Sequence, residues 1–266
     1  MRTIFLQALW ESLHRRVALA MLVVAILTAG MMCTASFQGQ PGQLYVESGR
    51  AHVPAAGYVN DRFTAVLGIT SGPWIILSLF AVAPLLTSHL EKGWAELLFA
   101  KGVARWQVVT ARVAGALAVF VLLLVILAIV PCGYLAWRAS VPFRPFLAAM
   151  ALITFNFVAY LAMMLLVSST QPNSALLIGV GFVQTLLSAA LMERQRVLYG
   201  VITWKGARWL IDWTYRILPK DAELSRQATW YLSKQTWLGW WPVWTTGVFV
   251  AVSAGWALWR FERKAL

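Results

Sequence analysis

The chain has 266 residues, of which 60% are hydrophobic and 12% charged, with a mean hydropathy of +0.70 and a formal net charge of +12. This balance excludes an ordinary soluble domain, in which about a quarter of the residues are charged. The basic residues are scattered at the ends of apolar runs, which argues against a nucleic-acid-binding surface and favours anionic lipid headgroups as their partner.

Six apolar segments approach the roughly 20 residues that a helix needs to cross a hydrocarbon core about 30 Å thick. Lipid offers no hydrogen-bond partner to free backbone groups, and the segments lack strand-like alternation, so each is predicted to be a helix. They cover residues 17–37, 69–88, 113–137, 146–167, 174–191 and 242–259. The predicted fold is an all-α polytopic membrane protein, with one transmembrane domain over residues 1–266.

The stretch from Arg2 to Arg16 is predicted to form an interfacial helix. Phe5, Leu9 and Leu13 recur on one helical face, while Glu11 and Arg15 can pair at i, i+4 on another. Such a helix would lie along the membrane surface before the chain turns into the first span.

Prolines and charges shape the next elements. Pro73 and Pro84 in the second span and Pro131 in the third are predicted to kink or break their helices. Residues 38–68, between the first and second spans, are expected to be a short loop outside the membrane, since their only basic residues are Arg50 and Arg62.

Three clusters of Lys and Arg predict the orientation of the chain. With six spans all three fall on one side, which the positive-inside rule assigns to the cytoplasm together with both termini. The clusters are Arg2, Arg15 and Arg16; Lys92, Lys101, Arg105 and Arg112; and Arg260, Arg263 and Lys264.

The segment between the second and third spans, residues 91–112, is charged and amphipathic and reads EKGWAELLFAKGVARWQVVTAR. It resembles the cytoplasmic coupling segment of the permease subunits of type-2 ABC exporters. In that pattern an acid and a Gly precede Glu-Leu-Leu, a short basic turn with Arg, and a basic residue at the third span. The matching residues are Glu91, Gly93, Glu96, Leu97, Leu98, Lys101, Arg105 and Arg112. Trp94 and Gly102 depart from it.

The resemblance implies that the chain is half of a transmembrane path in the bacterial inner membrane, with an ABC ATPase as partner in two copies. The second transmembrane subunit would be another copy of the chain or a paralogue. Charges for docking would come from Glu91, Glu96, Lys101 and Arg105. An apolar ridge would be formed by Trp94, Leu97, Leu98 and Trp106, which could alternatively bury against the spans. No GxxxxGK[ST] motif occurs, so the chain is expected to be no enzyme, and ATP and Mg would bind the partner ATPase.

The remaining spans contain few polar residues. Asn156 in the fourth and Gln184 in the fifth are expected to hydrogen-bond between helices or to line a path. Cys33 and Cys132 are predicted at similar depth near the outer ends of the first and third spans, which permits a disulfide. Two separate buried thiols are the alternative. No metal site or bound cofactor is expected.

Residues 193–240 are basic although six spans place them outside. A five-span arrangement is the alternative, but it would place the C-terminal basic cluster outside and is disfavoured. Lys205, Arg208, Asp212 and Arg216 recur at spacings of three and four residues, which predicts one polar face of a helix that ends before Pro219. The helix is expected to be interfacial or re-entrant, with its basic edge at lipid headgroups.

Another class of function also fits this layout. A membrane scaffold, or an assembly, maturation or immunity factor without its own transport cycle, would have a similar topology. A proton-coupled secondary transporter is disfavoured because the predicted spans are nearly empty of ionisable residues.

Overall fold

The computed structural model describes residues 16–33, 37–38, 45–48, 51–87 and 104–263, together with Trp10. Within this part of the chain, five helices are long and apolar enough to cross a membrane. They are Arg16–Cys33, Ala55–Thr87, Trp106–Ala139, Arg144–Ser168 and Ser174–Met192. The protein is therefore a multi-pass, helical membrane protein. The predicted interfacial helix before residue 16 lies almost wholly outside the described residues.

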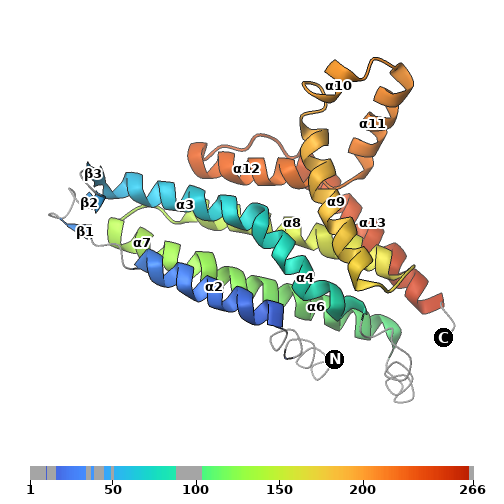
Figure 1. Cartoon of the computed structure of the whole chain (residues 1–266), viewed down its shortest axis with the longest axis horizontal. Helices are drawn as coiled ribbons and strands as arrows, with labels where there is room; N and C mark the ends of the chain where they lie inside the picture. The colour runs from blue at the N-terminus through green and yellow to red at the C-terminus, as the bar shows by residue number, and fades with distance from the viewer. Residues whose placement is uncertain are drawn as a thin grey trace.

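The first span, α2 (Arg16–Cys33), ends four residues earlier than predicted. A small antiparallel sheet follows, formed by β1 (Phe37–Gln38), β2 (Tyr45–Ser48) and β3 (Ala51–Pro54) in that order. All of its residues except Phe37 were expected to be loop. Val46 pairs with Val53 in the sheet and is buried. The sheet lies at one end of the helical bundle (Figure 1).

The second span is longer than the predicted residues 69–88, because α3 (Ala55–Ser71) precedes α4 (Pro73–Thr87). The helix is interrupted at Gly72, next to Pro73, one of the prolines that were predicted to break it. Residues 60–62 read Asn-Asp-Arg and are exposed, whereas Val59 and Phe63 on the opposite face are buried. Polar residues on one face lower the average hydropathy of α3, so a search for continuous apolar runs misses it.

The third span also begins earlier than the predicted residue 113. It consists of α6 (Arg105–Leu124), a π-helical stretch η2 (Val125–Ile129) and α7 (Val130–Ala139). Pro131 has no N–H to donate to the preceding turn, and the wider π turn lies just before it. The irregularity predicted at Pro131 is confirmed in this form.

The fourth and fifth spans, α8 (Arg144–Ser168) and α9 (Ser174–Met192), match their predicted bounds within two residues. Pro145 lies in the first turn of α8, where its missing N–H costs nothing. The Asn173 side chain caps α9 by accepting hydrogen bonds from the N–H groups of Ala175 and Leu176, at 2.9 and 3.4 Å. Local sequence therefore determines where both helices begin.

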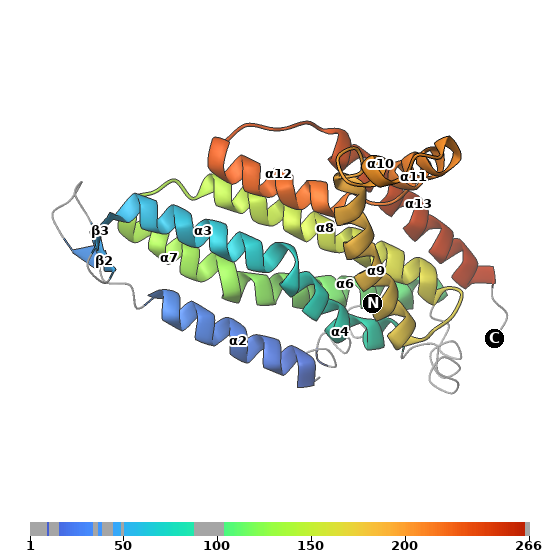
Figure 2. The same ribbon diagram turned by 45° about the horizontal axis from the view of Figure 1, so that its top comes forward.

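Four helices follow: α10 (Leu198–Val201), α11 (Lys205–Ile217), α12 (Asp221–Lys234) and α13 (Trp241–Arg263). The predicted helix that ends before Pro219 is confirmed as α11. In Figures 1 and 2, α10 and α11 project from the side of the bundle, whereas α12 lies along α8. Residues 193–240 thus contain one element packed on the spans and one that points away from them.

Helix α13 occupies the place of the predicted sixth span but is not among the five apolar helices. Its 23 residues include Trp241, Trp244, Trp256 and Trp259. Tryptophan lowers the average hydropathy of a helix although its ring is largely apolar.

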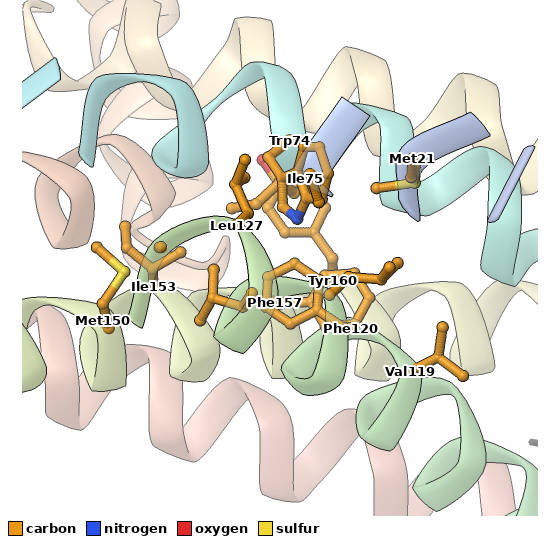
Figure 3. Packing of buried hydrophobic residues seen from close by; sticks show 14 of the residues in the cluster. Met21, Trp74, Ile75, Val119, Phe120, Leu127, Met150, Ile153, Phe157 and Tyr160 are labelled. Atoms are coloured by element: carbon orange, nitrogen blue, oxygen red, sulfur yellow. The ribbon is translucent and has the colours of Figure 1, made fainter. Parts of the chain in front are cut away.

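The core lies between α2, α4, α6, η2 and α8 (Figure 3). Phe120 and Phe157 stack with ring centroids 3.8 Å apart, and Trp74 and Met21 are buried nearby. The end of α4, the start of α6 and the end of α13 lie toward the end of the bundle opposite the sheet (Figure 1).

Candidate functional site

The segment predicted to couple to a partner lies almost wholly outside the described residues. This holds for Glu91, Gly93, Trp94, Glu96, Leu97, Leu98 and Lys101. Arg105 is the first residue of α6, but its side chain is outside the described part. The roles assigned to these eight residues therefore stay predictions. The structure does describe the helices on either side of the segment, α4 and α6.

Arg112 joins these two flanking helices. Its Nη1 donates a hydrogen bond of 3.0 Å to the main-chain carbonyl of Leu85, and its side chain is buried. Leu85 lies in the last turn of α4, at the negative end of the helix dipole. A buried guanidinium needs such a partner to be tolerated. The last turn of α4 is thus attached to α6 about two turns after α6 begins.

A second polar site lies inside the bundle, where α12 begins. Gln184 of α9 donates from Nε2 to Asp221 Oδ2 at 2.8 Å and to the Pro219 carbonyl at 3.1 Å. Asn156 of α8 donates from Nδ2 to the main-chain carbonyl of Asp221 at 3.4 Å. The side chains of all three hydrogen-bonding residues, Asn156, Gln184 and Asp221, are buried. Asn156 and Gln184, predicted in different spans, therefore both hydrogen-bond to the start of α12.

Side chains of other helices also bind the first N–H groups of α12. The Ala222 N–H donates to Ser188 Oγ of α9 at 2.9 Å, and the Lys220 N–H donates to Thr246 Oγ1 of α13 at 3.1 Å. Buried N–H groups in the first turn of a helix need partners from outside that helix. Hydroxyl groups of two neighbouring helices supply them here. We call this set the α12 junction: Asn156, Gln184, Ser188, Lys220, Asp221 and Thr246.

Asp221 is the acidic group of the α12 junction and is 4% exposed. Burial raises the pKa of its carboxyl to about 7, against the opposing effects of Gln184, Tyr160 and the charge of Lys220. A carboxyl with this pKa exists in both protonation states near neutral pH. The junction can therefore gain or lose a charge without leaving the pH range of a cell.

Tyr215 connects α11 to the junction. Lys220 Nζ and the guanidinium carbon of Arg194 each lie 3.5 Å from the centroid of its ring. The Tyr215 hydroxyl donates to Glu223 of α12. Burial lowers the pKa of Lys220 to about 8 and raises that of Tyr215 to about 12. Cations are attracted to the face of an aromatic ring, so α9, α11 and α12 are held together at this point.

The predicted polar face of α11 has two different roles. Asp212 accepts hydrogen bonds from Arg194 at 3.2 Å and from Tyr199. Arg208 donates to the main-chain carbonyls of Ile202 and Tyr199 at 2.7 and 2.9 Å. These two residues therefore fold the α10–α11 hairpin instead of facing headgroups. Lys205 and Arg216 remain as the part of that face for which a lipid contact stays a prediction.

Both cysteines are free thiols, with Cys33 exposed and Cys132 buried. The helices that carry them, α2 and α7, are in contact. Formation of the disulfide therefore stays a prediction. Within the described residues no group of three His, Cys, Asp or Glu side chains could hold a metal ion.

Asp221 was not singled out from the sequence, because it belongs to no apolar run and lies in the basic segment 193–240. A local signal was present. Pro219 stops α11, and Asp221 and Glu223 fall in the first turn of α12, where acidic residues favour helix initiation. That pattern predicts a helix start but says nothing of its burial.

Comparison with known proteins adds no identification: no protein-family model matches the chain, and no curated protein matches it in sequence.

Proposed function

We propose that this chain is the transmembrane subunit of an ATP-driven exporter of the type-2 ABC class. It pairs in the bacterial inner membrane with a second transmembrane subunit, either another copy or a paralogue. Residues 91–112 dock onto a separate ATPase, present in two copies, which binds ATP and Mg. Both termini are cytoplasmic and α13 is the sixth span.

The hydrogen bond between Arg112 and the Leu85 carbonyl carries this proposal. A coupling segment must pass a push from the ATPase to more than one membrane helix. Residues 88–104 connect the end of α4 to the start of α6, and the buried Arg112 prevents these two helix ends from separating. A displacement of the segment would therefore move both spans together.

The ends of α13 support its assignment as a span. Its 23 residues are about 35 Å long at 1.5 Å per residue, enough to cross the hydrocarbon core. Tryptophan residues lie near both ends, as in the aromatic belts of membrane proteins. Arg260 and Arg263 lie in the last turn, and Arg263 stacks on Trp259 at 4.2 Å. These basic residues support a cytoplasmic position for the end of α13, on the side of the other basic clusters.

The α12 junction fits the same proposal. It ties α8, α9 and α13 to one another through the start of α12. An exporter alternates between two arrangements of packed units, and each unit has to move as one body. The junction would make these helices one such unit, while α4 and α6 form the part that receives the push.

The first experiment is affinity purification of the tagged chain in mild detergent, with ATPase activity assayed on the co-purified proteins. We expect a stoichiometric ATPase that is lost in the variants Glu96→Arg and Arg105→Glu. Arg138→Glu is the matched control, because Arg138 is an exposed basic residue at the end of α7, near the opposite end of the bundle. This variant should keep the ATPase.

A chain that purifies without any ATPase from its native membrane would contradict the proposal and support a scaffold or maturation factor. An ATPase that binds equally to all three variants would reject the role of residues 91–112 but not the exporter assignment.

A further inference from the structure

A groove opens on the outer surface of the bundle between α11 and α13. Its volume is about 410 Å³, which lies within the range of small-molecule sites. The lining includes Arg216 of α11 and Trp241, Trp244, Val248, Phe249 and Val252 of α13. Apolar side chains that remain exposed in such a groove need an apolar occupant.

The apolar part of the groove has the shape of a straight stripe. Trp244, Val248 and Val252 are spaced four residues apart, so they follow one face of α13, and they are 70%, 60% and 64% exposed. From Trp244 to Val252 the helix rises about 12 Å. One leaflet of a hydrocarbon core about 30 Å thick is about 15 Å deep. The stripe therefore runs along most of the depth that one acyl chain fills in one leaflet.

The polar part of the groove is Arg216. Arg216 is exposed, and within the described residues no carboxylate lies at ion-pair distance from it. The nearest acidic residue on the same helix, Asp212, is bonded to Arg194 at 3.2 Å and feels the charge of Arg216 without pairing with it. The guanidinium of Arg216 lies 6.0 Å from the ring of Trp213. A guanidinium presents a planar set of donors that matches a phosphate group. Arg216 thus offers a site for an anion beside the apolar stripe.

The charge and the stripe are in the order that a lipid requires. The hydrogen bond from Lys220 N–H to Thr246 holds the chain just after α11 beside the first two turns of α13. Those turns contain Trp241 and Trp244, and tryptophan prefers the headgroup level of a bilayer. Val248 and Val252 follow in the next two turns.

We propose that the groove between α11 and α13 binds one anionic glycerophospholipid, with its phosphate on Arg216 and one acyl chain along Trp244, Val248 and Val252. This lipid site is independent of the proposed export function. The binding would hold the projecting α10–α11 hairpin against α13, because the headgroup contacts one helix and the acyl chain the other.

Native mass spectrometry of the detergent-purified chain tests this site with phosphatidylglycerol and phosphatidylcholine of identical acyl chains. We expect one tightly retained phosphatidylglycerol, preferred over phosphatidylcholine by about tenfold or more. Arg216→Gln should remove the preference, and Val248→Trp should fill the stripe and release both lipids. The matched controls are Arg196→Gln and Val201→Trp, which change an exposed arginine and an exposed valine outside the groove.

Photo-cross-linking provides a second readout. Phosphatidylglycerol with a diazirine in its acyl chain should label the peptide that contains residues 241–252, and Val248→Trp should abolish this labelling. Retention that is unchanged in Arg216→Gln and Val248→Trp, or reduced equally in the two controls, would overturn the proposal. Cross-links from Val248 to a second copy of the chain, without lipid labelling, would show that a protein interface covers the groove instead.

Discussion

Gln184 holds Asp221 at the point where α12 enters the bundle, with 2.8 Å between its Nε2 and the carboxylate Oδ2. The same nitrogen lies 3.1 Å from the Pro219 carbonyl, so one side-chain amide serves two acceptors of the segment that precedes α12. Both residues are buried, in a part of the molecule where water cannot replace a lost partner. The position of α12 against α8 and α9 depends on this contact.

Replacement of Gln184 by Leu should destabilise the protein. The change leaves the Asp221 carboxyl and the Pro219 carbonyl buried without their donor, which costs about 1–3 kcal/mol. A thermal unfolding midpoint measured in detergent should fall by several degrees. Gln171→Leu, at an exposed position in the turn before α9, is the control and should leave the midpoint unchanged. Equal midpoints for the two variants would show that the junction does not stabilise the fold.

Asp221 should make stability depend on pH. Its pKa is about 7 in the folded chain and about 3.8 in the unfolded one, so the folded state binds the proton more tightly. The free energy of unfolding should therefore be largest below pH 4 as far as this group is concerned, and should fall as pH rises from 4 through 7, by about 4 kcal/mol at most. Lys220, with its pKa of about 8, titrates above this window.

The variant Asp221→Asn isolates this contribution. It has no proton to lose, so its unfolding free energy between pH 4 and 7 should be flatter than that of the parent chain. Chemical denaturation in detergent at four pH values in this window measures both curves. Parallel curves for the two proteins would mean that Asp221 ionises with an ordinary pKa.

Gly181 should be far less tolerant of substitution than Gly179 on the same helix. A Cβ on Gly181 would lie 2.4 Å from Cδ1 of the fully buried Leu79 of α4, whereas a Cβ on Gly179 meets nothing within 4 Å. Gly181→Val should force α9 and α4 apart at a cost of about 1–3 kcal/mol. Gly179→Val should be nearly neutral. Unfolding midpoints of the pair decide this, and a larger loss at Gly179 would contradict the close approach of the two helices.

Arg112 should control how firmly the end of α4 is held. Arg112→Met removes the donor to the Leu85 carbonyl while keeping most of the apolar stem. Hydrogen–deuterium exchange in the last turn of α4 and the first turns of α6 should then increase, about tenfold for each 1.4 kcal/mol of local stability lost. Arg138→Met, at the opposite end of the bundle, should change neither region. If exchange near Leu85 is unaffected, the two helix ends are joined by other contacts.

Several features could be predicted from local sequence because their causes are local. The starts of α8 and α9 follow from Pro145 and Asn173, because each of these residues acts on the first turn of its helix. The end of α11 follows from Pro219. The irregular turn near Pro131 follows from a missing N–H group. In each case the residue responsible lies within a few positions of the structure that it determines.

Other features could not be predicted in this way. Helix α3 was expected to be loop, because its buried face is interrupted by polar residues that point outward. The small sheet of β1 to β3 lacks an apolar run altogether. Asn156 and Gln184 were singled out as polar residues in spans, but their shared neighbour Asp221 lies 65 and 37 residues away from them in the chain.

The sequence by itself determined that this chain is a helical membrane protein, and it also located most of the long spans. The free energy of placing a segment in lipid depends on the composition of about 20 consecutive residues and on satisfying their own backbone. Only the tertiary structure decided which polar groups are buried and with what partner, as for Arg112 on Leu85 and Gln184 on Asp221. Burial and hydrogen-bond pairing depend on residues that packing brings together from distant parts of the chain. The composition of a segment does not specify these neighbours.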